Sequence, residues 1–390
     1  MNLFRLKTGL LKFGKKFLKE IIIAFVLAIV AAIIIEVYLD HSRNKMLENN
    51  TKAVATLMVY NAKAELIASA SGIFISSDGN LVTNYHVIKN AYNIDAKLSS
   101  GAYYKVKECI GISKIHDLAI LKFDAKDVPF IKIRKVDKIN IGEAVFTIGS
   151  PIGLEKSVSE GIISNPQRQE GGIDLIQFTA PISSGNSGGG LFTKHGIIIG
   201  ITTNTIIPSQ PNENVQNLNF AVPVKYVEKA ITGQDIEFTE NNPDFYYSQG
   251  VIYSNKKEYE KAEACLKKAI SKDVNYVDAY IKLGEIYYYL EKYDDEVKVL
   301  EVAKTIMPND TDVYFSLANA YEDISKYDLA ISAYEKNLEL KPNDKDALYD
   351  ICVLYIMTGL KNKAVKFIPT LSKMNPGLGK EIEMLISQTK

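Results

Sequence analysis

The chain has 390 residues and is 47% hydrophobic, which is enough for two folded units that each bury their own core. Lysine plus arginine and aspartate plus glutamate both number 46, so the formal net charge is zero. This balance argues against a nucleic-acid-binding protein, because such proteins gain affinity from an excess of basic side chains that neutralise phosphates.

The three cysteines and four histidines are scattered along the chain. Neither residue type shows the close spacing of a disulfide framework or a zinc site. We therefore predict no metal site and no cofactor.

A basic segment and an apolar segment open the chain. Six lysines and arginines precede the first acidic residue, Glu20, and Ile21 to Ile35 then carry no charge. A bilayer-spanning helix needs about 20 apolar residues. We therefore predict a basic cytoplasmic N-terminus over residues 1–16, a single-pass signal-anchor helix over 17–39 and a linker over 40–49. By the positive-inside rule, everything that follows would be extracytoplasmic at the cell membrane.

A cleaved signal peptide is the competing interpretation, because Ala28, Ala31 and Ala32 are small. Apolar residues continue beyond these alanines, however, and no clean A-x-A exit follows. A buried globular helix is disfavoured further, since it would give the charge asymmetry no purpose.

Residues 50–233 show the pattern of an all-β domain. Short apolar runs alternate with turn residues, and Asp78-Gly79 indicates a tight hairpin. We expect strands at Ala53–Tyr60, Gly72–Ser76, Leu81–Thr83, Leu118–Phe123, Ala144–Ile148, Ile197–Thr203 and Asn219–Val222.

Three motifs in this region carry chemistry: TNYHVI at 83–88, HDLAILKF at 116–123 and SSGNSGGGLF at 183–192. Together, in this order, they resemble the trypsin-like serine proteases, and among these the HtrA (Deg) type, over about residues 50–230. The resemblance implies a chymotrypsin-like double β-barrel over 50–233. It also implies a catalytic triad of His86 as general base, Asp117 as its orienting carboxylate and Ser187 as nucleophile.

Elementary chemistry agrees with these roles. A serine hydroxyl is a poor nucleophile at neutral pH, so a histidine must take its proton during attack and return it to the leaving amine. Glycines near Ser187 allow backbone N–H groups to turn towards the developing oxyanion. We assign the oxyanion hole to Gly185, Asn186 and Ser187, and expect Ile201, Thr202 and Thr203 to bind substrate.

The C-terminal half is a helical repeat. Tyr253, Tyr287, Tyr321 and Tyr355 recur every 34 residues, the period of tetratricopeptide repeats. After a linker at 234–243, we predict about four such repeats over 244–380 and a C-terminal helix or tail at 381–390. Their concave face would bind a protein partner.

The leading interpretation is a membrane-anchored serine endopeptidase that cleaves unfolded or partner-delivered polypeptides. A protease with one dedicated protein substrate would share these sequence features. The alternative is a membrane-tethered interaction adaptor with an inactive protease-like domain. HtrA-type relatives usually carry PDZ modules where the repeats stand here, so assembly into a homo-oligomer stays open.

Overall fold

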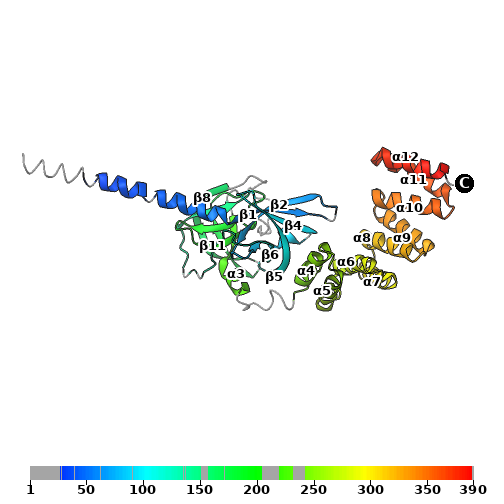
Figure 1. The fold of residues 1–390 in the computed structure, drawn as a ribbon, viewed down its shortest axis with the longest axis horizontal. Helices are drawn as coiled ribbons and strands as arrows, with labels where there is room; N and C mark the ends of the chain where they lie inside the picture. The colour runs from blue at the N-terminus through cyan, green and yellow to red at the C-terminus, as the bar shows by residue number, and fades with distance from the viewer. Residues whose placement is uncertain are drawn as a thin grey trace, which may run out of the picture.

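The computed structural model describes residues 27, 29–38, 40–61, 63–89, 91–134, 136, 138–150, 157–170, 172–203, 219–231 and 242–388. These residues form two closed β-barrels followed by an array of helices (Figure 1). The predicted double barrel and the predicted helical repeat are both confirmed.

The first barrel closes in the order β1-β2-β3-β6-β5-β4. Alternate residues of β1, such as Ala55, Leu57 and Val59, point into its core because side chains on a strand alternate between faces. The hairpin predicted at Asp78-Gly79 is present, with Phe74 opposite Leu81. The strands are β1 (Val54–Tyr60), β2 (Leu66–Phe74), β3 (Asn80–Thr83), β4 (Asn93–Leu98), β5 (Tyr103–Ser113) and β6 (Leu118–Phe123).

The second barrel closes in the order β10-β11-β12-β9-β8-β7, and helix α3 (Val224–Ile231) follows it. Strands β4, β5, β8, β9 and β10 were not among the predicted runs. Long, half-exposed strands such as β8 carry many polar residues, which hides them from a search for apolar runs. The strands are β7 (Ala144–Gly149), β8 (Ser157–Glu170), β9 (Ile173–Phe178), β10 (Gly190–Thr193), β11 (Ile198–Thr203) and β12 (Asn219–Pro223).

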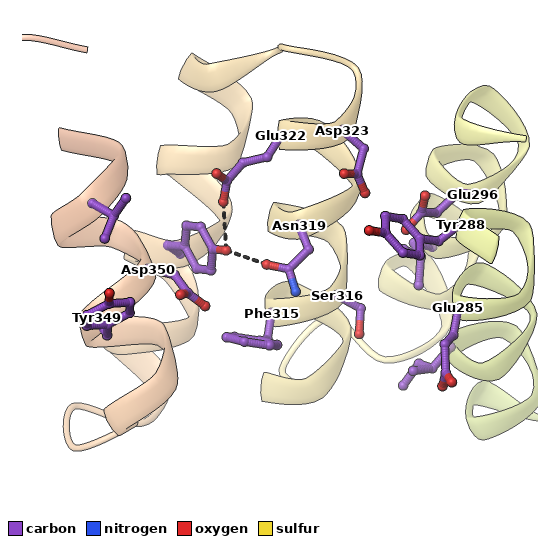
Figure 2. Close-up of a pocket in the computed structure, with 14 residues that line it drawn as sticks. Glu285, Tyr288, Glu296, Phe315, Ser316, Asn319, Glu322, Asp323, Tyr349 and Asp350 are labelled. Atoms are coloured by element: carbon purple, nitrogen blue, oxygen red, sulfur yellow. Dashed lines mark hydrogen bonds between the residues drawn. The ribbon is translucent and has the colours of Figure 1, made fainter. Parts of the chain in front are cut away.

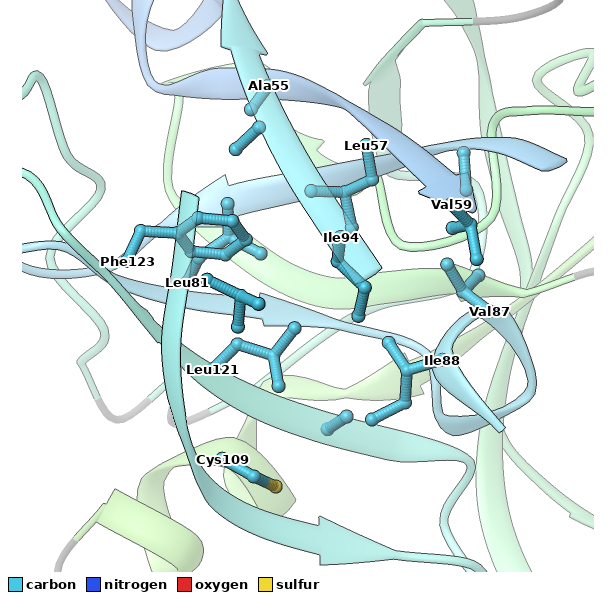
Figure 3. Close-up of a cluster of buried hydrophobic side chains, with 14 of the residues drawn as sticks. Ala55, Leu57, Val59, Leu81, Val87, Ile88, Ile94, Cys109, Leu121 and Phe123 are labelled. Atoms are coloured by element: carbon cyan, nitrogen blue, oxygen red, sulfur yellow. The ribbon is translucent and has the colours of Figure 1, made fainter. Parts of the chain in front are cut away.

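A shared hydrophobic core joins the barrels. Ile73, Val82 and Leu118 of the first barrel pack in one cluster with Phe192 and Ile201 of the second. The first barrel also anchors the short helix α2 (Tyr85–Ile88), whose Val87 and Ile88 enter its interior (Figure 3). These contacts bring the three sequence motifs to one interface.

The helical array has four helix pairs and a last helix, and its pairs begin at residues 243, 277, 311 and 345, in the predicted 34-residue register. The terminal helix begins earlier than expected, at Pro376, where proline suits a first helical turn. The helices are α4 (Pro243–Asn255), α5 (Tyr259–Lys272), α6 (Val277–Tyr289), α7 (Tyr293–Ile306), α8 (Thr311–Asp323), α9 (Tyr327–Leu340), α10 (Lys345–Met357), α11 (Lys361–Met374) and α12 (Pro376–Gln388).

Helix α4 docks the array onto the first barrel. Its Ile252 joins the core of that barrel, and Gln249 Oε1 accepts a hydrogen bond from the Cys109 N–H of β5 at 2.6 Å. Asp244, at the start of α4, receives a hydrogen bond from Tyr276 Oη at 2.7 Å and lies 3.9 Å from Lys114 Nζ. The repeats therefore start in direct contact with the segments that carry His86 and Asp117.

Residues 40–49, predicted as a linker, are helical, and Met46 and Leu47 of this helix pack against the core that includes the second barrel. Arg43 pairs with Glu160 at 2.6 Å, and Asn50 Nδ2 donates to the Gly196 carbonyl at 3.0 Å. Much of the predicted membrane span, residues 17–26, 28 and 39, lies outside the described residues, as does most of the linker predicted at 234–243. No helix in the described part of the chain is both long and apolar enough to cross a bilayer.

Candidate active site

His86 and Asp117 meet although 31 residues separate them. His86 Nδ1 lies 2.8 Å from Asp117 Oδ2, and the His86 backbone N–H donates to Oδ1 at 2.9 Å. The imidazole side chain is 29% exposed and the carboxylate side chain 12% exposed. One carboxylate therefore holds both the ring, through Nδ1, and the main chain of the histidine.

The turn before β6 presents Asp117 to this pair. Asp117 has a left-handed backbone, with φ of +50°, and its carbonyl accepts a hydrogen bond from Asn84 Nδ2 at 2.9 Å. Non-glycine residues pay a conformational cost for positive φ, so the surrounding contacts must hold this geometry. The T-N-x-H motif supplies one such contact through its asparagine.

Thr203 completes the support of the carboxylate. Its Oγ1 donates to Asp117 Oδ2 at 2.8 Å across 86 residues of sequence. Thr202, beside it, donates through Oγ1 to the Asn186 carbonyl at 2.7 Å. Two neighbouring threonines of β11 thus tie the His86–Asp117 pair to the loop that carries Ser187.

The Ser187 loop is tightly built, and Ser187 is 5% exposed. Gly185 and Gly188 have φ of +94° and +83°, which favours glycine. A Cβ on Gly188 would also clash with the Ser71 carbonyl oxygen and Thr83 Oγ1. The glycines of the motif are therefore required by backbone conformation and by close packing.

Ser71 of β2 holds this loop, and sequence reasoning missed it. Its N–H donates to the Ser187 carbonyl at 2.8 Å, and its Oγ donates to the Gly185 carbonyl at 2.7 Å. Its carbonyl accepts from Thr83 Oγ1 at 2.8 Å, and the side chain is fully buried. The available signal was a serine that directly precedes the run of small and apolar residues Gly72 to Phe74, which are buried in β2.

The three residues expected to bind substrate are all buried, at 0% to 1% exposure for Ile201, Thr202 and Thr203. Ile201 packs between the barrels, while the two threonine hydroxyls bond inward. The side chains of Thr202 and Thr203 thus bond within the protein, and substrate binding at these positions stays a prediction.

Asn186, in the predicted oxyanion hole, donates its N–H to the Ser183 carbonyl at 3.0 Å. His116, next to Asp117, turns away from the site: its ring lies 3.9 Å from that of Tyr226 in α3. Among the described residues, no group of three or more His, Cys, Asp or Glu side chains is arranged to hold a metal ion.

This fold and these side chains define a double-barrel domain built around a histidine, an aspartate and a serine loop. Residues 70–201 match the family model of the trypsin-like peptidase domain, and residues 243–272 and 311–344 match models of the tetratricopeptide repeat. The chain thus contains a trypsin-like peptidase domain followed by tetratricopeptide repeats.

Curated relatives are similar over the peptidase domain. The protein named "Probable periplasmic serine endoprotease DegP-like" from Pseudomonas putida is 37% identical over 157 residues, which is 40% of this chain and 32% of that protein. Its namesake from Chlamydia muridarum is 37% identical over 165 residues, or 41% and 32% of the two chains. This chain therefore spans about a third of the length of these relatives.

A solved structure of the HtrA-type protease AlgW with tripeptide has 30% sequence identity and a TM-score of 0.43, and covers 49% of this chain and 62% of that chain. Over the peptidase domain, the chain is thus similar in sequence to DegP-like serine endoproteases.

Proposed function

We propose that this chain is a serine endopeptidase that hydrolyses peptide bonds through His86, Asp117 and Ser187. The observation that carries the proposal is the network in which Asp117 accepts hydrogen bonds from His86 and Thr203, while Thr202 bonds the Ser187 loop. A histidine with a purely structural role would need only one hydrogen-bond partner. Here the partner, Asp117, is itself held in place by Thr203.

In this mechanism His86 Nε2 takes the Ser187 hydroxyl proton as Oγ attacks the scissile carbonyl. Asp117 keeps the proton on Nδ1 and stabilises the imidazolium that forms. The imidazolium then protonates the leaving amine, and an acyl-enzyme remains on Ser187. A water molecule, activated by the same histidine, hydrolyses this ester and restores the serine.

Backbone N–H groups of Gly185 and Ser187 would stabilise the oxyanion. The Asn186 N–H is already committed to the Ser183 carbonyl, so its part is to close the turn that shapes the loop. Loss of one oxyanion donor raises a barrier by about 2.7 to 4 kcal/mol. Ser71, which holds the carbonyl of Gly185, therefore matters for the orientation of this loop.

We also propose a membrane anchor over residues 17–39, with the peptidase and repeats extracytoplasmic. Eight large apolar side chains within residues 27–38 are at least 44% exposed, and hydrocarbon would bury them. If so, the full chain stays with membranes after an alkaline carbonate wash. Release of the full chain by that wash would contradict the anchor.

The repeats would recruit substrate or partner proteins, since stacked helix pairs present a concave face that suits extended polypeptides. Their rigid start at α4 keeps any bound segment at a set position relative to the first barrel.

The decisive test is labelling of the full chain with a fluorophosphonate, with casein cleavage measured in parallel. Wild type should label and cleave, whereas Ser187→Ala should do neither. Absence of labelling and cleavage in a folded wild type would instead favour the adaptor with an inactive protease-like domain.

A further inference from the structure

The repeats enclose a broad cavity of about 580 Å³ far along the array from the peptidase motifs. Its walls come from three successive repeats (Figure 2). Glu285, Tyr288 and Glu296 lie on one side, Tyr349 and Asp350 on the other, and α8 runs between them.

The lining is acidic. It contains Glu285, Glu296, Glu322, Asp323 and Asp350 but no lysine or arginine. Glu285 is paired with Lys282 at 2.8 Å, and Glu322 accepts a hydrogen bond from Tyr334. Burial, reinforced by Glu322, raises the pKa of Asp350 to about 6. The cavity thus gathers carboxyl groups, and burial makes some of them harder to ionise in the absence of a cation.

Glu296 is the sharpest feature of this wall. It is 5% exposed, and its Oε2 has no hydrogen-bond partner within the described part of the chain. Burial, with a smaller contribution from Asp323, raises its pKa to about 7. A buried carboxylate without a partner is costly, so its presence needs a compensating function.

The repetition of the array makes this residue stand out further. The positions 34 or 68 residues away hold Ala262, Ala330 and Ala364, all fully buried small residues. An alanine at this position therefore suffices for the two helices of a pair to pack against each other. Glu296 therefore replaces a packing residue by a charge that faces the cavity.

The chemistry of the lining indicates an organic cation. Among the described residues, no three or more His, Cys, Asp or Glu side chains are grouped closely enough to hold a metal ion. Aromatic rings of Tyr288, Phe315 and Tyr334 stand beside the carboxylates, and ring faces attract guanidinium and ammonium groups. Carboxylates distributed over three repeats suit several cationic side chains along one chain better than a single compact ion.

We propose that this acidic cavity binds an extended polypeptide segment that carries arginine or lysine side chains, one of which pairs with Glu296. The proposal rests on the recruiting role of the repeats and names the chemistry of the recruited chain. Binding is tested separately from catalysis, so a failure of one does not imply failure of the other.

The test uses the full chain with Ser187→Ala, so that no peptide is cleaved, and fluorescence anisotropy of labelled Gly/Ser peptides that contain arginine, citrulline or glutamate. The arginine peptide should bind, and the citrulline peptide, which keeps the shape without the charge, should bind at least about tenfold more weakly. Added salt should weaken binding of the arginine peptide.

Glu296→Gln and Asp350→Asn should each weaken the arginine peptide about tenfold or more. The matched control Glu339→Gln removes an exposed carboxylate outside the cavity and should change affinity less than about twofold. Glu296→Ala, which restores the small residue of the other repeats, should lose binding while the array stays folded by thermal unfolding. The proposal would be overturned if the arginine and citrulline peptides bound equally or if both cavity variants kept the wild-type affinity. It would also be overturned if spermine, tested as a compact polyamine in the same assay, bound while the arginine peptide did not.

Discussion

The peptidase site and the repeat cavity both bury a carboxylate, but they differ in the number of hydrogen-bond donors that surround it. Asp117 accepts hydrogen bonds from His86 Nδ1, the His86 N–H and Thr203 Oγ1. Glu296 is equally buried, yet one of its oxygens has no partner among the described residues. In the mechanism we propose, the first carboxylate stabilises charge that develops on its own chain, whereas the second would meet charge that arrives with a ligand.

This difference implies different costs. A carboxylate with three donors is stabilised in the free protein, while an unpaired one destabilises the free protein until a cation binds. Loss of the negative charge should therefore stabilise the free protein at Glu296 but not at Asp117, and the contrast between the two sites can be tested in order of decreasing effect.

The largest effect is expected for Asp117→Asn. The amide cannot hold the His86 tautomer, so kcat for peptide hydrolysis should fall about 10⁴-fold. Stopped assays with a fluorogenic protein substrate would measure it, and a thermal unfolding curve close to that of wild type would show that the fold is kept. A loss smaller than about tenfold would remove Asp117 from the mechanism.

Ile252→Ala tests whether the two regions are one mechanical unit. The side chain is 6% exposed within the core of the first barrel, so truncation should lower the free energy of unfolding by about 2 to 5 kcal/mol. Calorimetry should then separate the transitions of the barrels and the repeats. Val365→Ala, at an exposed position of α11, serves as the control and should leave stability nearly unchanged.

Glu296→Gln should stabilise the protein in the absence of ligand. A folded-state pKa raised to about 7, above the ordinary 4.5, means that the folded form prefers the protonated acid. Wild type therefore loses stability as pH rises from about 4.5 to about 7, and the loss is complete above that range. The variant avoids it, with a gain of about 3 kcal/mol at pH 8 that shrinks towards pH 5. Chemical denaturation at both pH values would measure the difference, and a destabilised variant at pH 8 would contradict the assigned role.

Thr203→Val gives the smallest effect. It removes the donor to Asp117 while it keeps the shape, so kcat should fall about tenfold with little change in KM. Thr203→Ser, which restores the hydroxyl, should recover most of the rate. A purely structural threonine would show no recovery with serine.

Features that depend on residues close together in the sequence could be predicted, whereas features that depend on residues far apart in the sequence could not. The motifs around His86, Asp117 and Ser187 are local and were recognisable from sequence, as was the 34-residue period of the array. Strands such as β8, with polar residues along an exposed face, were missed because their pairing partners determine them. The helix over the predicted linker at 40–49 contacts the second barrel through Met46 and Leu47, which no local pattern in the sequence indicates.

The sequence by itself determined the motifs from which we propose the catalytic residues and the positions where helices repeat, because motif spacing and apolar periodicity are properties of neighbouring residues. Only the tertiary structure decided that Thr203 supports Asp117, that Ser71 holds the Ser187 loop and that α4 docks on the first barrel. The carboxylates that line the cavity come from three repeats and occupy different positions of the 34-residue period, so the periodicity of the sequence does not predict them. The physical reason is the same throughout: hydrogen bonds and charges act between atoms that packing brings together, whatever their separation along the chain.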